Sequence, residues 1–414
     1  MSLSNLTEGL DRALSGIPNS TLGVAVSGGG DSVALLHMLA ARGDGLWAIT
    51  IDHGLRKESA DEAAQVAVLC RALSVQHTIL KWEGWDKSGN LQDEARKARL
   101  RLIANWAARE GISHVALGHT MDDQAETVLL RLARGSGVDG LSGMAAQRMD
   151  NGLTWVRPLL HVRRKVLRAY LVAENVTWAD DPSNDDLIYD RVKARQALKH
   201  LDDLGLSVEG LVETAERMKD ARTALESATL ALAEECVEVT DAGEVRIDQA
   251  IFNAASDEIR FRLFSATLKW ISGATYRPRF DSLRRVLARI DKENGQTLQR
   301  CVIRLLNRNI VVRREVARVE SPAPLDAMWD HRWVVTQTGP DKADKIAALG
   351  KDGLRYCEDW RESGHAREVL LASPAIWSNG QLVAAPKAGK ANGWAIKLKY
   401  GKKGLQESDR KSVV

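Results

Sequence analysis

A run of three glycines flanked by serines is the segment of this chain best suited to chemistry: Ser27-Gly-Gly-Gly-Asp-Ser32. Glycine permits positive φ angles and lets main-chain N–H groups approach an anion closely. An apolar run precedes the turn and a helical pattern follows, so a helix N-terminus adds unpaired N–H groups and a favourable dipole. The hydroxyl groups of Ser27 and Ser32 can donate to the same anion. The sequence therefore predicts a phosphate site here.

Asp31 is unexpected in a phosphate turn, because a carboxylate repels phosphate. Its presence is explained if Mg²⁺ bridges the carboxylate and the phosphate. The turn lacks the Gly-Lys-Ser/Thr ending of a Walker A loop and the GxGxxG spacing of a dinucleotide site. Two other interpretations stay open: a purely structural turn, and a nucleophile elbow in which Ser27 attacks an acyl group with His53 or His119 as base.

Acidic residues crowd the start of another predicted helix. Asp122, Asp123 and Glu126 follow Gly118 and His119, which end an apolar run. The helix dipole favours acids at this position, so capping alone is an alternative explanation. Three acids beside a histidine exceed what capping needs, and they predict binding of Mg²⁺ or of a cationic amine.

Two further segments carry polar residues in informative places. Asp52 and His53 end a predicted strand, where adenosine could be bound, although a capped turn is the alternative. Arg96 and Arg99 lie one helical turn apart and could face one phosphate, although a charged helix surface is the alternative. The turn Asp181-Pro-Ser-Asn184 precedes a helix start and reads either as a site loop or as a well-capped connection.

These residues need a scaffold that brings them together. Over the first 130 residues, short β-branched runs alternate with longer helical patterns, which predicts a parallel sheet covered by helices on both faces. Ligands of such sheets bind at the carboxyl ends of the strands, so the turns after Val26, Ile51 and Leu117 should meet. We expect strands at 22–26, 46–51, 75–80 and 114–117, and helices at 32–42, 58–73, 91–109 and 122–134.

The length of 414 residues indicates two or three domains. We expect an α/β fold: a doubly wound parallel-sheet domain at 1–200, a basic, mainly helical domain with added strands at 201–320, and a small β-rich unit at 325–414. The proline-containing segment 321–324 reads as a linker. No apolar run reaches the roughly 18 residues that span a membrane, and the N-terminus lacks a signal-peptide pattern, so a cytoplasmic protein is expected.

The net charge of +3 conceals strongly basic segments. The segment 260–314 holds 14 Lys and Arg residues against three acids, and 386–404 holds six lysines and no acid. Such blocks attract polyanions, because neutralised phosphates release counterions; a solvated helix face is the alternative. The four cysteines are widely separated, which argues against a zinc finger, an iron–sulfur site or a disulfide framework.

The glycine turn resembles the SGGxDS signature of the PP-loop ATP pyrophosphatases, which adenylate a carbonyl oxygen of their substrate and release pyrophosphate. Over about residues 20–200, the order of motifs is similar to that of the tRNA(Ile)-lysidine synthetases. The motifs that carry this resemblance are Asp52-His-Gly-Leu-Arg56, the Ala-Arg-x-x-Arg helix, Gly118-His-Thr-Met-Asp-Asp-Gln-Ala-Glu-Thr127, the run ending at Gly137, Trp155-Val-Arg-Pro158 and Asp181-Pro-Ser-Asn184. Tyr276-Arg-Pro-Arg279 and 296–301 resemble the family's second domain more weakly. After Asp190-Arg191 the family often has Asn-Arg-x-Arg, whereas this chain has Val192-Lys-Ala-Arg195.

The resemblance implies a ligase that forms a carbon–nitrogen bond. Its members use ATP and Mg²⁺ to adenylate the wobble cytidine of an isoleucine tRNA with a CAU anticodon, and L-lysine then displaces AMP to give lysidine. The expected catalytic residues are Asp31, Asp123 and Glu126, with Asp31 and Asp123 as Mg²⁺ ligands and Asp122, Asp123 and Glu126 as lysine ligands. The expected ATP-binding residues are Ser27, Gly28, Gly29, Gly30, Asp31, Ser32, Asp52, His53, Gly118 and His119. The expected tRNA-binding residues are Arg96, Arg99, Arg191, Arg195, Arg277, Arg279, Arg284 and Arg285.

Two other functions remain open at this point. One is another PP-loop tRNA enzyme such as a tRNA thiolase, although sulfur insertion usually needs a reactive cysteine or a cluster. The other is an RNA-binding protein that is gated by a nucleotide and has no catalysis. The sequence also leaves open whether the chain forms a homodimer.

Overall fold

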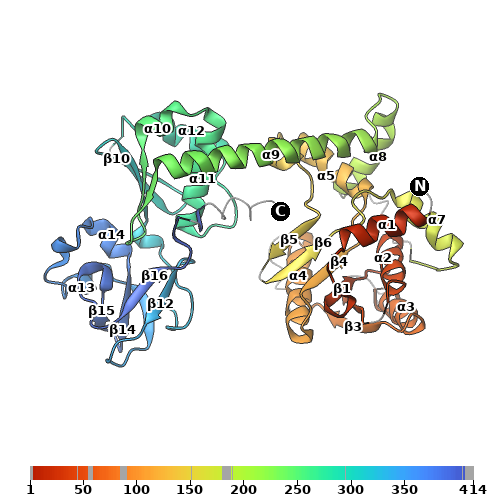
Figure 1. The fold of residues 1–414 in the computed structure, drawn as a ribbon, viewed down its shortest axis with the longest axis horizontal. Helices are drawn as coiled ribbons and strands as arrows, with labels where there is room; N and C mark the ends of the chain where they lie inside the picture. Colours follow the sequence, from red (N-terminus) through yellow and green to blue (C-terminus); the bar gives the residue numbers. More distant parts are fainter. Residues whose placement is uncertain are drawn as a thin grey trace. The chain divides into compact units, whose positions relative to one another are not determined.

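The computed structural model describes residues 3–43, 45–54, 59–83, 91–150, 152–179, 188, 190–293, 295–402 and 404–405. The chain divides into two compact units, Met1–Arg222 and a second unit that begins at Thr223. Each unit is described by itself below. The elements are labelled in Figure 1.

A six-stranded sheet forms the centre of the first unit, in the order β3-β2-β1-β4-β6-β5. All neighbouring strands are parallel except β5 and β6, which form an antiparallel edge. The order changes direction between β1 and β4, so their carboxyl ends border the crevice where ligands of such sheets bind. The strands are β1 (Leu22–Ala25), β2 (Trp47–Asp52), β3 (Gln76–Lys81), β4 (His114–Leu117), β5 (Gln147–Asp150) and β6 (Leu153–Val156).

Helices cover both faces of this sheet, because each strand turns alternate residues to opposite sides. On one face, Leu22 and Val24 pack with residues of α1, α2 and α7. On the other face, Trp106 from α4 packs against β4 and β6, and a Cβ atom at Gly23 would lie 2.9 Å from its ring. The helices are α1 (Leu3–Ala13), α2 (Gly30–Ala40), α3 (Ser59–Ala72), α4 (Leu91–Glu110), α5 (Met121–Ala133), α6 (Val138–Leu141), α7 (Arg164–Ala173) and α8 (Asp190–Asp202), with the short η1 (Asn19–Thr21). The predicted doubly wound sheet is confirmed.

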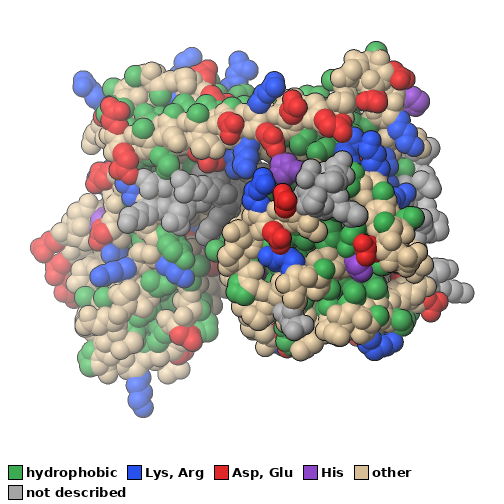
Figure 2. Space-filling view, turned by 45° about the vertical axis from the view of Figure 1, so that its right-hand side comes forward, with side chains coloured by type: hydrophobic (Ala, Val, Ile, Leu, Met, Phe, Trp, Pro, Cys, Tyr) green, Lys and Arg blue, Asp and Glu red, His purple; other side chains and the backbone are tan. Residues whose placement is uncertain are grey.

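The long helix α9 (Val208–Cys236) contains the boundary between the units. Leu211 and Val212, near its start, pack against Val128 of α5 and Leu198 of α8. Figure 2 shows acidic and basic side chains next to one another along its exposed surface, as expected for a solvated helix face. The structure therefore extends the first unit beyond residue 200, and the division of the remainder into 201–320 and 325–414 stays a prediction.

A five-stranded antiparallel sheet in the order β7-β8-β11-β10-β9 begins the second unit. Its core includes Phe252, Phe264 and Leu268 from the helices that pack on the sheet. The elements are β7 (Val237–Val239), β8 (Val245–Asp248), β9 (Gln296–Leu298), β10 (Cys301–Leu306), β11 (Asn309–Arg314), α10 (Gln249–Ala254), α11 (Asp257–Ser272), α12 (Phe280–Arg289) and η3 (Val316–Arg318).

The last part of the chain is β-rich, as predicted, and has its own cores. Trp329 and Trp333 are fully buried there. The segment 321–324 is not a free linker, because the main chain of Ala323 exchanges two hydrogen bonds of 2.9 Å with Ile346. The elements are β12 (Trp333–Gln337), β13 (Lys345–Ala348), β14 (Pro374–Ser378), β15 (Gln381–Ala384), β16 (Ala395–Leu398), α13 (Gly350–Leu354), α14 (Arg367–Ala372), η4 (Trp360–Ser363) and η5 (Pro386–Ala388).

The basic segment 260–314 is less available to a partner than its composition suggests. Arg313 and Arg314 are buried and pair with Glu244 and Asp330, which come from outside the segment. Three more of its arginines pair with nearby acids: Arg260, Arg262 and Arg289. The sequence count missed this neutralisation, because the partner acids of the two buried arginines are distant in sequence. Across the described ranges, no helix is long and apolar enough to cross a membrane.

Candidate active site

The glycine turn joins β1 to α2, as the sequence predicts. Gly28 has a φ of +88°, in the left-handed region that favours glycine. Gly29 is the N-cap of α2 and provides no side-chain cap, so the start of the helix remains able to accept an anion. The Ser27 N–H donates to Ser32 Oγ at 3.1 Å, and Ser32 Oγ donates to the Gly29 carbonyl at 2.9 Å. The two serines therefore hold the turn in shape.

Close main-chain packing places this turn beside the end of β4. A Cβ atom at Gly118 would lie 3.0 Å from the N and Cα atoms of Ser32, so only glycine fits without displacement. On another side, the main-chain N–H of Ala179 donates to the Gly28 carbonyl at 3.0 Å. The Trp178 ring packs over Gly30, where an added Cβ atom would lie 3.3 Å away. The predicted Asp181-Pro-Ser-Asn184 motif continues from here but lies outside the described residues.

The acidic helix α5 begins with a reciprocal cap between Thr120 and Asp123. The N–H and the Oγ1 hydroxyl of Thr120 both donate to Asp123 Oδ2, each at 2.8 Å. The N–H of Asp123 donates back to Thr120 Oγ1 at 3.3 Å. This capping box fixes the Asp123 carboxylate and leaves its other oxygen, Oδ1, directed into the site.

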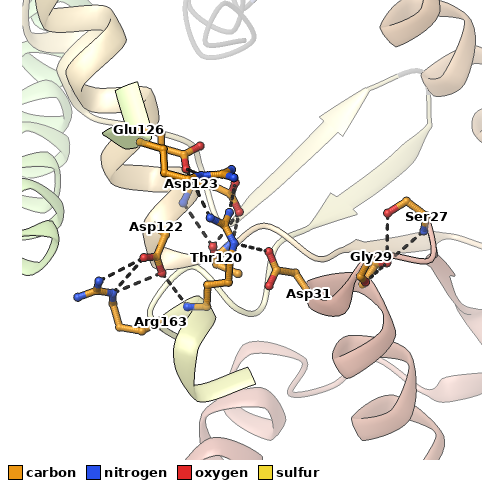
Figure 3. Close-up of polar contacts among 11 residues, drawn as sticks. Ser27, Gly29, Asp31, Thr120, Asp122, Asp123, Glu126 and Arg163 are labelled. Carbon is orange, nitrogen blue, oxygen red and sulfur yellow. Dashed lines mark hydrogen bonds and ion pairs between the residues drawn. The ribbon is translucent and has the colours of Figure 1, made fainter. Parts of the chain in front are cut away.

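Arg164 connects the acids of α2 and α5. Its Nε lies 2.8 Å from Asp31 Oδ2, its Nη2 lies 2.9 Å from Asp123 Oδ1, and its Nη1 lies 3.5 Å from Glu126 Oε1. Figure 3 shows Asp31, Asp123 and Glu126 turned toward the same place, next to the turn that contains Gly29. The structure thus brings together the three residues that the sequence assigned to catalysis.

The carboxylate of Asp122 points elsewhere, toward the start of α7 (Figure 3). Its Oδ2 accepts the main-chain N–H of Arg164 at 2.7 Å, and both of its oxygens accept from Arg163 Nε at 3.3 Å. Arg163 also pairs with Glu209. Asp122 is therefore part of the site region, but its side chain caps α7 and does not meet the other two acids of α5.

Burial and the neighbouring charges set the protonation of the acids. Burial raises the pKa of Asp31, and the Arg164 guanidinium opposes that rise only in part. Burial and the nearby Asp123 raise the pKa of Glu126, although Arg195 Nε donates to Glu126 Oε1 at 2.9 Å. Burial acts on Asp123 in the same direction, but Arg164 and the Thr120 main chain outweigh it, so the pKa of Asp123 lies below its ordinary value. Glu126 is therefore a better proton acceptor than Asp123.

Asp52 and His53 occupy the end of β2. Asp52 Oδ1 accepts from the Gly54 N–H at 2.9 Å and from Ser59 Oγ at 2.6 Å, and these bonds lower the pKa of Asp52. The carboxylate therefore connects the end of β2 with the first residue of α3. His53 packs edge-on against Trp82, and its Nδ1 atom is buried and has no partner among the described residues.

A nucleophile elbow is not supported. The Ser27 hydroxyl shares a hydrogen bond with Ser32 Oγ at 3.2 Å, and in the described part of the chain it contacts neither His53 nor His119. Burial lowers the pKa of His119 to about 3, and nearby arginines add to this effect. Its buried Nδ1 also lacks a partner among the described residues. His119 is therefore a neutral ring with one unused polar atom.

A group of arginines lies next to His119. The pKa of Arg99 falls to about 10, because it is buried and because Arg96 and Arg191 repel its charge. Burial also lowers the pKa of Arg157 to about 10, and the nearby positive charge of Arg96 adds to this effect. Arg157 Nη1 donates to the Ala145 carbonyl at 2.9 Å. Like charges brought together in this way fit a polyanion, and three of these four arginines were predicted to bind tRNA.

Five predicted tRNA residues remain: Arg195, Arg277, Arg279, Arg284 and Arg285. Arg195 lies against Glu126 and so borders the acidic site. Arg277, Arg279, Arg284 and Arg285 belong to the second unit, where Arg279 is the N-cap of α12 and the last two lie on its exposed surface. Their part in tRNA binding remains a proposal.

The donor set fits Mg²⁺ held together with a phosphate. Asp31 and Asp123 offer two carboxylates beside the phosphate turn, and Mg²⁺ commonly takes one or two carboxylates plus phosphate oxygens. Glu126 is fully buried, and its Oε2 has no partner among the described residues. Within those residues, no three His, Cys, Asp or Glu side chains form a ready-made metal cluster. Arg164 stands between the carboxylates instead.

Sequence reasoning missed Arg164, Arg157, Thr120 and Trp178. A signal existed for Thr120, because a Thr with an acid three residues later is a capping-box pattern. Arg157 lies inside the Trp-Val-Arg-Pro motif, but nothing in that motif indicates where its side chain points. Arg164 stands in a run of three basic residues, which reads as an exposed helix face.

Known proteins are similar to this chain over most of its length. Residues 3–201 match the family model of the PP-loop domain. The tRNA(Ile)-lysidine synthase of Ruegeria pomeroyi is 45% identical over 410 residues, covering 98% of this chain and 97% of that protein. The protein of the same name from Wolbachia pipientis is 36% identical and is matched over 89% of each chain. Among solved structures, the U34-tRNA thiolase NcsA of Methanococcus maripaludis is similar with a TM-score of 0.46 and 16% identity, covering 52% of this chain and 79% of that one. The chain belongs to the tRNA(Ile)-lysidine synthase family.

Proposed function

We propose that this enzyme converts the wobble cytidine of a CAU-anticodon isoleucine tRNA into lysidine, using ATP and L-lysine. The observation that carries the proposal is the convergence of Asp31, Asp123 and Glu126 on one point beside an uncapped helix start. A helix start binds phosphate, and buried carboxylates bind a cationic amine. The site therefore has a place for each of the two small substrates.

The chemistry needs two displacements. The cytidine O2 attacks the α-phosphorus of ATP, and pyrophosphate leaves. The lysine ε-amine then attacks C2 of the activated ring, and AMP departs with the oxygen that was O2. The glycine turn stabilises the negative charge of the departing pyrophosphate. Mg²⁺, when bound by Asp31 and Asp123 together with the phosphates, supplies further charge neutralisation.

Lysine must lose a proton before it can attack, since an ammonium group has no free electron pair. Glu126 is the residue best placed to take that proton, because its pKa is raised and its Oε2 has no partner among the described residues. Asp123 holds the amine next to it. Arg195 fixes Glu126 Oε1 and so directs Oε2. The contacts of Asp122 favour a structural role, which narrows the lysine site to Asp123 and Glu126.

Binding of the tRNA requires an unstacked base on the tRNA and a positively charged surface on the protein. A base in the anticodon loop can leave its stack at low cost. The group formed by Arg96, Arg99, Arg157 and Arg191 would bind the phosphates next to that base. Arg277, Arg279, Arg284 and Arg285 would contact phosphates elsewhere on the tRNA. Such contacts position the substrate without reading its sequence.

A tRNA thiolase is less well supported. All four cysteines are buried and free, and burial raises the thiol pKa of each: to about 11 for Cys70 and Cys236, to about 12 for Cys301, and upward for Cys357. A reactive thiol needs the opposite shift, because the thiolate is the nucleophile.

The test is incubation of the full chain with ATP, radiolabelled lysine and bulk tRNA. We expect alkali-stable label in tRNA and one AMP per lysine incorporated, and neither in the Glu126→Gln variant. Label that enters tRNA only from sulfide would establish the thiolase instead. Tight tRNA binding with no incorporation of either label would establish the non-catalytic RNA-binding protein.

A further inference from the structure

The structure assigns to Arg164 the role of a resident cation that holds Asp31, Asp123 and Glu126 together until Mg²⁺ and the lysine amine replace it. This inference rests on the proposed Mg²⁺ and lysine sites. It concerns a residue that takes part in none of the phosphate, metal or amine contacts proposed above.

Its first support is the geometry of the guanidinium. Three different nitrogens of one side chain contact three carboxylates, at 2.8, 2.9 and 3.5 Å. The carboxylates come from two elements, α2 and α5. Arginine suits this task, because its planar fork presents donors in several fixed directions. Without a cation at this point, the two buried carboxylates and the partly buried carboxylate of Asp31 would repel one another.

The oxygens that Arg164 occupies are the ones that the substrates need. Asp123 Oδ2 is already bound twice by Thr120, so Oδ1 is the oxygen left for a metal ion or an amine. Arg164 Nη2 takes that oxygen, and Arg164 Nε takes Asp31 Oδ2. Mg²⁺ bridging Asp31 and Asp123 through these oxygens must therefore displace the guanidinium.

The backbone of Arg164 is fixed while its side chain is free to exchange partners. Its N–H is bound by Asp122, which also pairs with Arg163, so the start of α7 is anchored to α5. Among the described residues, the guanidinium is joined to the site through its charged contacts with the three carboxylates. When it leaves Asp31, it remains beside the phosphate turn, where the phosphates of ATP offer it a new partner.

The experiment measures Mn²⁺ binding to the full chain by the loss of the free-ion electron paramagnetic resonance signal, without nucleotide. It compares the wild type with Arg164→Gln and with Lys165→Gln, a control that removes one exposed charge from the next residue. We expect Arg164→Gln to bind Mn²⁺ about tenfold more tightly, since a site that is open only about a tenth of the time loses about tenfold in apparent affinity. Lys165→Gln should bind as the wild type does. Equal or weaker binding by Arg164→Gln overturns the inference.

Thermal unfolding distinguishes an Arg164 side chain that exchanges with Mg²⁺ from one that only supports the fold. We expect Arg164→Gln to unfold at a lower temperature than the wild type without metal, and to recover more stability than the wild type when Mg²⁺ is added. A variant that is destabilised equally with and without Mg²⁺ shows that Arg164 only supports the fold. Failure of the proposed Mg²⁺ site looks different: the wild type would then bind no Mn²⁺ even with a non-hydrolysable ATP analogue. Failure of the proposed function appears separately, as no incorporation of labelled lysine into tRNA by the wild type.

Discussion

Replacement of Asp122 by alanine separates two roles for this residue, a cap for α7 and a ligand for lysine. The change removes the 2.7 Å hydrogen bond from the Arg164 N–H and the ion pair with Arg163. In that pair the Arg163 side chain is 23% exposed and the Asp122 side chain is 19% exposed. Loss of a charged cap costs about 1–2 kcal/mol and loss of a partly exposed ion pair up to about 1 kcal/mol. Together these losses should lower the unfolding midpoint of the first unit by roughly 5–10 °C.

The lysine KM decides between the roles. Because the Asp122 carboxylate points to α7, we expect its removal to change the lysine KM by less than about threefold, whereas Glu126→Gln should abolish lysine incorporation. Asp122→Asn keeps an acceptor for the Arg164 N–H and should recover about half of the lost stability. A large rise in lysine KM with an unchanged unfolding midpoint would refute the capping role and return Asp122 to the lysine site.

Three other outcomes follow from the same site. Asp31→Ala should abolish pyrophosphate release while tRNA binding stays within about a few-fold of the wild type, and normal turnover with Mg²⁺ and ATP would contradict its role. His119 should remain neutral at pH 5 in histidine NMR spectra, because its pKa is lowered to about 3. The unfolded chain takes up a proton at this histidine below about pH 6.5, so the contribution of His119 to the free energy of unfolding is lost as the pH falls. The His119→Gln variant should therefore lose less stability at low pH than the wild type. Arg99→Gln should weaken tRNA binding and lower the slope of log affinity against log salt by about one, whereas an unchanged slope would exclude a phosphate contact.

The sequence predicted the scaffold well, because its signals are local. The alternation of strand and helix patterns, and the glycine turn between β1 and α2, depend on residues that are close in the chain. The rule that ligands bind at the carboxyl ends of parallel strands then predicts from the sequence alone that Asp31 and Asp123 lie close together. The structure places their carboxylates 2.8 and 2.9 Å from the nitrogens of one guanidinium.

The sequence could not predict where side chains point or which distant partner they meet. Asp122 and Asp123 are neighbours, yet one carboxylate turns to α7 and the other into the site, because successive helical residues differ in direction by about 100°. Arg164 lies 133 residues from Asp31, and no spacing rule connects them. Neutralisation of Arg313 and Arg314 by Glu244 and Asp330 was hidden for the same reason.

The tight fit at Gly118 constrains how this scaffold can vary. Because main chain touches main chain there, the span between the anion-binding turn and the acidic helix is a fixed dimension that no rotamer change can widen. Under the proposed function, we expect a larger or smaller amine to be accommodated on the α7 and α8 side, where Arg164 and Arg195 contact Asp123 and Glu126. Altered amine preference in an engineered or natural variant is accordingly expected to come from substitutions at those arginines, with the glycine kept.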